Sequence, residues 1–114
     1  MPQTKKKGLF EAVEERKFLE LLQSRYPLLW MKLRYNALLR EWQKWSQIET
    51  ERLQPHKRLK ATNELGKLLS QLNQAVEKLE GAGIKVSPTE LLSGFLPSWE
   101  EQRIIANLRK EVAL

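Results

Sequence analysis

The sequence predicts an all-α protein: a small helical bundle built on a long antiparallel helix hairpin, with an N-terminal helix and two short C-terminal helices. Two observations lead to this fold class. Apolar residues recur at helical spacings along nearly the whole chain, and no stretch shows four or more clean alternations of apolar and polar residues. Five prolines and five glycines divide this pattern into segments of helical length.

The first two helices are expected on either side of Pro27. The first runs from about Leu9 to Arg25, and Pro27 marks its end because the residue before a proline is pushed out of the helical conformation. The second is predicted from about Leu28 to Leu53, a length of roughly 39 Å at 1.5 Å per residue. Its apolar residues follow a 3-4-3-4-3 spacing, which is typical of a helix that packs lengthwise against another. This seam consists of Leu28, Met31, Tyr35, Leu38, Trp42 and Trp45.

The third helix repeats the seam pattern and ends where Gly81 provides its C-terminal cap. The sequence allows two different first residues for this helix. Pro55 suits the first helical position, although Gln54 is a poor N-cap; alternatively Thr62 caps a later start and leaves an exposed basic connection before it. Either start leaves a short link to the second helix, which favours an antiparallel hairpin.

Two short helices complete the chain, and each has a clear start signal. Ser87 precedes Glu90 by three residues, and Ser98 precedes Glu101 by the same interval. This is the spacing of a capping box, in which each side chain bonds a free backbone N–H of the other residue. The apolar sides are formed by Leu91, Leu92 and Phe95 in the first, and by Trp99, Ile105, Leu108 and Val112 in the second.

Length and composition limit the class of protein. At 114 residues the chain suits one domain, predicted over 9–114 after a flexible basic tail at 1–8. The absence of cysteine excludes disulfides, structural zinc and thiol catalysis. No apolar run approaches the ~18 residues of a membrane span, and no apolar stretch of a secretory signal follows the N-terminal lysines. We therefore expect a cytoplasmic protein that has no membrane partner.

The excess of positive over negative charge lies in two parts of the chain. The formal net charge is +6, with an excess of three basic residues in 1–8 and of five in 28–60. Residues 61–114 are neutral to slightly acidic. Such clustering favours a polyanionic partner, although a basic face is also what a solvated, solubilising helix surface carries, and this alternative stays open.

A helical wheel at about 100° per residue separates charge from aromatic rings on the second helix. Lys32, Asn36, Arg40 and Lys44 form a stripe centred roughly 150° from the tryptophan seam. A stripe without aromatic rings can contact phosphates but cannot stack bases, so binding should be sequence-independent and salt-sensitive. The predicted nucleic-acid-binding residues are Lys5, Lys6, Lys7, Lys32, Arg40, Lys44, Arg52, Lys57, Arg58 and Lys60.

The seam itself predicts an interface. Trp42 and Trp45 are expected to be buried in the bundle or against a partner, whereas Trp30 lies off the seam and is the better candidate for an exposed aromatic. A bundle of this size has a modest core, so its long apolar seams favour association with a protein partner or a second copy. The predicted interface residues are Trp30, Met31, Tyr35, Leu38, Trp42 and Trp45.

Catalytic motifs have little support. His56 is the one histidine and lies in a basic link, and Glu14 and Glu15 are adjacent, so they point in different directions from one helix. Gly66 lacks the upstream glycine of a phosphate-binding loop. We therefore expect no catalytic residue, metal ligand, cofactor or small-molecule substrate.

The two C-terminal helices have the outline of a helix-turn-helix. Trp99, Arg103, Asn107 and Lys110 are its conceivable groove-facing residues. The second of these helices has no net charge, however, and two glutamates lie at the end that would enter the groove. Packing of the pair across the open end of the hairpin is the preferred prediction.

Two functions from different classes remain. The first is a non-catalytic, basic helical subunit that contacts the backbone of RNA or DNA within a larger assembly, as small subunits of CRISPR effector or DNA-packaging complexes do by analogy of size and character. The second is a helical adaptor, regulator or homo-oligomer that uses the tryptophan-rich seam. The clustering of the basic residues favours the first, although function drawn from architecture is an analogy.

Overall fold

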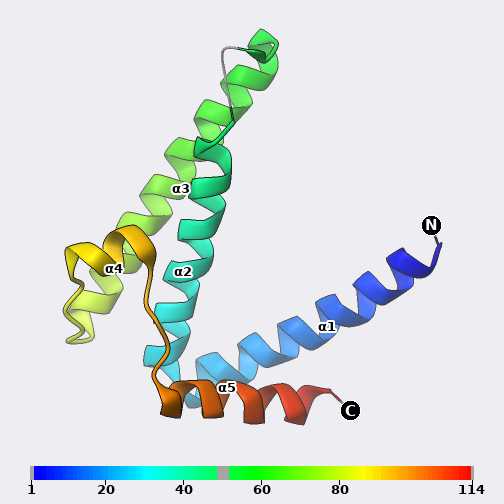
Figure 1. The fold of residues 1–114 in the computed structure, drawn as a ribbon, viewed down its shortest axis with the longest axis vertical. Coiled ribbons are helices and arrows are strands. Elements are labelled where there is room, and N and C mark those ends of the chain that lie inside the picture. Colours follow the sequence, from blue (N-terminus) through cyan, green and yellow to red (C-terminus); the bar gives the residue numbers. More distant parts are fainter. Residues whose placement is uncertain (1, 49–51, 114) are drawn as a thin grey trace. The chain divides into compact units, whose positions relative to one another are not determined.

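The computed structural model is helical nearly throughout the residues that it describes, which are 2–48 and 52–113, with side chains described at 9, 11–48 and 52–113. The predicted all-α class is confirmed, since these residues contain no strand (Figure 1). The described helices are α1 (Pro2–Arg25), α2 (Pro27–Ser46), α3 (Pro55–Gly81), α4 (Pro88–Ser93) and α5 (Trp99–Val112).

The helices divide between two compact units. Unit 1 comprises residues 1–30 and 96–114 and holds α1, the first turn of α2, and α5. Unit 2 comprises residues 31–95 and holds the remainder of α2, α3 and α4. Two compact units can belong to one domain, so the single domain expected over 9–114 stays a prediction.

Helix α1 begins earlier than the sequence predicted. Its backbone is helical from Pro2, so 2–8, the segment expected to be a flexible tail, forms its first turns. Proline suits the first helical position because the N–H it lacks has no helical partner there. Lys5, Lys6 and Lys7 lie on these turns, and their side chains are outside the described residues.

Helix α2 ends at Ser46, and the predicted extension to Leu53 is wrong. The Ser46 hydroxyl donates a hydrogen bond to the Gln43 carbonyl at 2.8 Å, and the Ile48 N–H donates to the Trp45 carbonyl at 3.3 Å. A serine that bonds the backbone locally, followed by a tightened i to i+3 turn, competes with continued α-helix. The predicted end fell beyond residues 49–51, which lie outside the described residues.

Helix α3 starts at Pro55, which is the earlier of the two starts that the sequence left open. Gln54 precedes it without a side-chain capping bond. At the other end Gly81 is the last helical residue, and Gly83, with φ of +89°, takes the left-handed conformation expected of Gly81. The Gly83 N–H donates to the Glu80 carbonyl and the Ile84 N–H to the Leu79 carbonyl, each at 3.0 Å. These two bonds define a Schellman motif, which satisfies the last carbonyls of α3.

Both predicted capping boxes are present. The Glu90 N–H donates to Ser87 Oγ at 3.2 Å, and the Ser87 N–H donates to Glu90 Oε1 at 3.0 Å. At α5 the Glu101 N–H donates to Ser98 Oγ at 3.1 Å, and the Ser98 N–H donates to Glu101 Oε1 at 2.9 Å. The starts of α4 and α5 are therefore determined by short-range signals.

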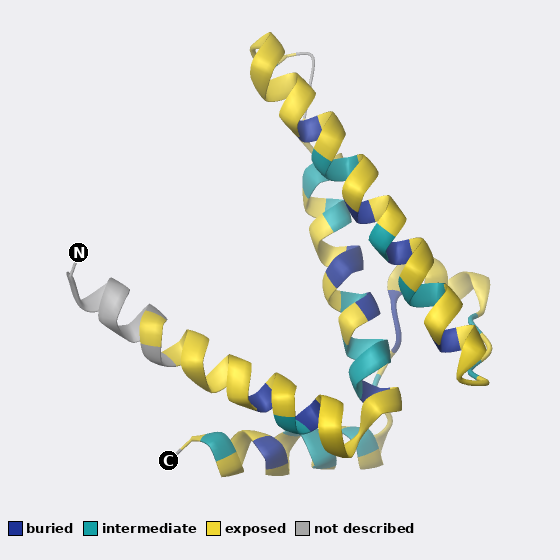
Figure 2. Cartoon of the chain, turned by 180° about the vertical axis from the view of Figure 1, so that it is seen from behind, coloured by how far each residue is buried: buried dark blue, intermediate teal, exposed yellow. Residues whose placement is uncertain are grey.

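Unit 1 is held by α1 packed against α5. Among its described residues the buried positions of α1 are Phe18 and Leu22, both in the C-terminal half of the helix, and Leu108 is buried on α5 (Figure 2). The Arg109 guanidinium lies 3.7 Å from the centroid of the Phe18 ring and also pairs with Glu15. One side chain of α5 thus contacts both an aromatic face and a carboxylate of α1.

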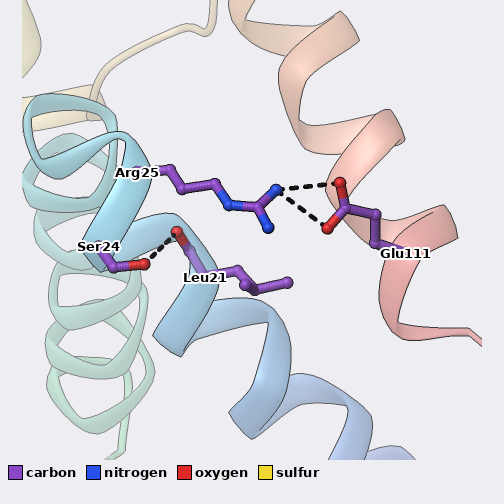
Figure 3. Close-up of polar contacts among 4 residues, drawn as sticks. All are labelled: Leu21, Ser24, Arg25 and Glu111. Atoms are coloured by element: carbon purple, nitrogen blue, oxygen red, sulfur yellow. Dashed lines mark hydrogen bonds and ion pairs between the residues drawn. The ribbon is translucent and has the colours of Figure 1, made fainter.

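A second ion pair joins the same two helices. Arg25 Nη1 donates to both carboxylate oxygens of Glu111 at 3.0 Å, while the Ser24 hydroxyl donates to the Leu21 carbonyl at 3.1 Å (Figure 3). The side chains of this pair are about half exposed, so its contribution to stability is small. The buried apolar contacts therefore provide most of the stability of unit 1.

Unit 2 has one core cluster, to which α2 and α3 both contribute. Its buried members are Tyr35, Leu38 and Leu39 from α2, Leu68, Leu72 and Leu79 from α3, and Phe95 from the segment after α4. The rings of Tyr35 and Phe95 meet edge to face, with centroids 5.7 Å apart and planes at 82°. The Tyr35 hydroxyl donates to the Leu91 carbonyl at 2.6 Å, which ties α4 to α2.

The Asn36 side chain clamps the backbone of Phe95. Its amide nitrogen donates to the Phe95 carbonyl at 2.7 Å, and the Phe95 N–H donates back to Asn36 Oδ1 at 2.7 Å. The approach depends on the preceding glycine, because a Cβ on Gly94 would lie 2.6 Å from Asn36 Oδ1. Gly94 also has φ of +86°, a conformation that other residues rarely adopt.

We expect Tyr35→Phe to lower the free energy of unfolding by about 1 kcal/mol at pH 7, because it removes the bond to the Leu91 carbonyl. Burial raises the pKa of the Tyr35 phenol, so the folded state favours its protonated form. The stabilisation is therefore complete below the ordinary pKa of tyrosine and is lost as the pH rises through the raised pKa. Urea unfolding between pH 7 and about 11 measures this loss.

The matched control is Tyr26→Phe, which changes an exposed tyrosine of unit 1. Its effect on unfolding should be small at pH 7. If the stability difference between Tyr35→Phe and the wild type does not change with pH, the role given to the buried phenol is wrong.

Gly94→Ala should lower the free energy of unfolding by about 2 kcal/mol or more, through backbone strain and loss of the Asn36 clamp. Gly66→Ala in α3 is the control, because a Cβ there meets nothing within 4 Å. Replacing this helix-interior glycine should stabilise the protein by about 0.5 to 1 kcal/mol. Urea denaturation of the two variants should therefore give shifts of opposite sign, and shifts of the same sign would contradict the clamp.

Candidate nucleic-acid interface

Most of the basic residues predicted to contact nucleic acid have exposed side chains. Lys32 is half-buried and makes a contact within the structure, and the side chains of Lys5, Lys6 and Lys7 are outside the described residues. The exposed members are Arg40, Lys44, Arg52, Lys57, Arg58 and Lys60, all in unit 2.

The basic stripe predicted on α2 is shorter in the structure. Asn36, which lies in its middle on the helical wheel, is used in the clamp on Phe95. The segment that follows α4 therefore occupies part of the surface between Lys32 and Arg40. The exposed basic residues of the predicted stripe are reduced to Arg40 and Lys44 at the C-terminal half of α2.

The start of α3 carries the densest basic cluster among the residues whose side chains are described. From Arg52 to Asn63 the sequence has four lysines and arginines, one histidine and no acidic residue. The first turn of α3 has no acidic residue either, and Gln54 leaves it without a side-chain cap. The N-terminus of a helix is the positive end of its macrodipole, and cations there destabilise the helix. Helix stability therefore does not explain this arrangement.

One arginine of this cluster has a local structural role. Arg58 Nη2 donates to the Leu53 carbonyl at 3.2 Å, and the Thr62 hydroxyl donates to the Arg58 carbonyl at 3.0 Å. Lys57 and Lys60 have exposed side chains on the same turns. These two lysines are therefore the better positions at which to test binding.

The predicted interface residues of the seam pack inside unit 2. Tyr35 and Leu38 are buried in the core cluster, and Met31, Trp42 and Trp45 are half-buried against it. Two of the tryptophans thus serve the fold, as expected for a seam. Trp30 is also half-buried, so the prediction that it is the exposed aromatic is wrong.

The exposed tryptophan is Trp99, the first residue of α5, with 73% of its surface accessible. The sequence pattern predicted Trp99 on the apolar side of this helix together with Leu108, and this prediction is wrong. Nine residues at about 100° each put Trp99 opposite the buried Leu108, a signal that the sequence already contained. Arg103, Asn107 and Lys110 are exposed as well, as the groove-facing prediction required. The helix-turn-helix outline stays a prediction, since α4 and α5 belong to different units.

The described residues have few polar side chains in their interior. Apart from the Tyr35 phenol they contain no buried polar or charged side chain, and they contain no group of three possible metal ligands. A pocket of about 550 Å³ in unit 1 is lined by Lys17, Glu20, Leu21, Ser24, Glu111 and Val112. Three polar side chains of its lining already have partners, because Ser24 bonds its own helix, Glu111 pairs with Arg25 and Glu20 pairs with Arg16. None of the described helices has the length and apolar content needed to cross a membrane.

The chain matches no protein-family model, no curated protein and no solved structure. Its function has to be inferred from its own residues and their geometry.

The exposure of the four tryptophans predicts their fluorescence. Trp99 should account for most of the quenching by acrylamide, because Trp30, Trp42 and Trp45 are half-buried. Trp99→Phe should therefore remove the easily quenched, red-shifted component of the emission and leave the remainder unchanged. The corresponding Trp45→Phe variant should keep that component. Retention of strong quenching in Trp99→Phe would contradict the exposure assigned to this residue.

Proposed function

We propose that this protein is a non-catalytic helical subunit that contacts the phosphate backbone of RNA or DNA, independently of sequence, within a larger cytoplasmic assembly. Its fold would be a bundle on the long antiparallel hairpin of α2 and α3. The small subunits of CRISPR effector and DNA-packaging complexes are the functional analogy, in size and character.

The observation that carries this proposal is the exposed basic surface of unit 2. It consists of Arg40 and Lys44 on α2 and of the cluster from Arg52 to Lys60. We call it the unit 2 basic surface. Exposed lysine and arginine side chains can each meet a phosphate and release its counterions, which makes binding strongly dependent on salt.

The separation of charge from aromatic rings supports a contact with phosphates in unit 2. Trp42 and Trp45 pack against the core cluster, so they are not available beside Lys44 as a platform for bases. A surface of this kind contacts the backbone and does not read base edges. Sequence-independent binding follows from that chemistry.

The second candidate is a helical adaptor, regulator or homo-oligomer. Its supporting observation is that Met31, Trp42 and Trp45 are only half-buried, which leaves part of the seam accessible to a partner. Sedimentation velocity over a range of concentrations tests self-association. Dimerisation that Trp42→Ala abolishes, together with no affinity for nucleic acid, would favour this candidate over the first.

Charge reversal tests the first candidate. Lys44→Glu combined with Lys57→Glu should weaken binding to generic duplex DNA and RNA, and should reduce the slope of log K against log salt by about 2 for duplex DNA. The control is Lys78→Glu combined with Lys85→Glu, which makes the same change to the net charge at exposed positions outside the basic surface. Filter binding between about 50 and 200 mM salt measures both.

The control variant should bind nearly as well as the wild type. Surface substitutions of this kind change stability little, and urea unfolding checks that both variants are folded. If the two variants lose affinity equally, net charge alone determines binding, and the unit 2 basic surface is not the contact. If neither loses affinity, the proposal fails.

A further inference from the structure

The outward face of α5 combines an aromatic ring with cations. Trp99, Arg103, Asn107 and Lys110 fall within an arc of about 80° on a helical wheel. All four side chains are exposed, and the buried Leu108 lies on the opposite side of the helix. We call these four residues the α5 face. Along the helix axis they extend over about 16 Å at 1.5 Å per residue.

Although α5 has no net formal charge, one of its faces is positive. The helix has three basic and three acidic residues. Two of the acids are engaged elsewhere: Glu101 closes the capping box with Ser98, and Glu111 pairs with Arg25 of α1. Arg109 is engaged too, by Glu15.

The charges left without such partners are two cations on the α5 face and one acid at its edge. Arg103 and Lys110 make no side-chain hydrogen bond or ion pair with another described residue. Glu100 is exposed and lies about 20° beyond Asn107 on the helical wheel. The local balance on this side of α5 is therefore positive.

An exposed indole next to two cations has the chemistry of single-stranded nucleic-acid binding. Unpaired bases stack on aromatic side chains whatever their identity, while basic side chains follow the backbone. Bases inside a duplex are already stacked on one another and cannot reach the ring. A face of this kind therefore discriminates single strands from duplexes, which the unit 2 basic surface does not.

We propose that the α5 face binds single-stranded RNA or DNA, with an unpaired base stacked on Trp99. Arg103 and Lys110, which both lie C-terminal to Trp99 along α5, contact the phosphates that follow on one side of this base, and the Asn107 amide hydrogen-bonds a base edge or sugar. This inference rests on the proposed function, since it takes nucleic acid to be the partner of the chain. It adds to that function a preference for single strands over duplexes and a second binding site, in unit 1.

The test compares single-stranded and duplex oligonucleotides of the same length, using the full chain and fluorescence anisotropy. Trp99→Ala should weaken binding to the single strand by about 5- to 100-fold and leave duplex affinity within about 2-fold of wild type. Trp99→Phe should restore part of the loss because phenylalanine still offers a ring. The control is Leu69→Ala, which removes an exposed apolar side chain from α3 and should change neither affinity.

The outcomes separate this proposal from the proposed function. If Lys44→Glu with Lys57→Glu abolishes binding and Trp99→Ala changes nothing, the α5 face is refuted and the unit 2 basic surface stands. If Trp99→Ala reduces single-strand binding and Lys44→Glu with Lys57→Glu does not, binding by the α5 face is supported and binding by the unit 2 basic surface is refuted. Equal losses on single strand and duplex overturn the strand selectivity. A change in sedimentation behaviour of Trp99→Ala without a change in affinity makes the face a protein contact and overturns the proposal.

Discussion

The contact between Asn36 and the backbone of Phe95 determines much of unit 2. One amide satisfies both the N–H and the carbonyl of Phe95 at a position where water has little access, so neither group is left unpaired. It also places the Phe95 ring against Tyr35. Helix α4 has only six residues, far fewer than an isolated helix needs to be stable. Its position therefore depends on this clamp and on the bond from Tyr35 to Leu91.

The same contact explains which parts of the structure the sequence could predict. The capping boxes at Ser87 and Ser98 depend on residues three positions apart, and both were predicted correctly. The clamp joins residues 59 positions apart, and no local pattern contains that information. A helical wheel gives the direction of Asn36 from α2, but not which other segment meets it there. For this reason Asn36 was assigned to a solvent-facing stripe.

The remaining differences have local causes. The end of α2 lacks a glycine or proline, and the serine that competes with the helix is a weaker signal. At the end of α3 two glycines lie two residues apart, and only the hydrogen bonds show that Gly83 takes the left-handed position. Trp99 was misplaced because residue type suggested burial, whereas its angle on the wheel indicated exposure. The all-α class and most of the seam depend on repeated spacing and were not affected by these errors; of the six seam residues only Leu28 is exposed.

The basic residues and the aromatic residues of this chain are arranged differently in the two units. In unit 2 the tryptophans support the core and most of the cations face solvent, whereas on α5 an indole and two cations share one exposed side. Both arrangements follow from helical periodicity acting on short stretches of sequence. A description by composition alone, as a basic and tryptophan-rich chain, does not distinguish these two arrangements.

The ion pairs of unit 1 also have a consequence for the order of folding. Arg25 and Glu111 are 86 positions apart, and Arg109 and Glu15 are 94 positions apart. Unit 2 is the continuous stretch between the two parts of unit 1. Its core lies within one continuous stretch and can therefore form without the ends of the chain, whereas Phe18 and Leu22 of α1 are covered only when the distant α5 packs against them. Prior folding of unit 2 also shortens the flexible loop that closure of unit 1 must bring together, which lowers the entropic barrier to the last step.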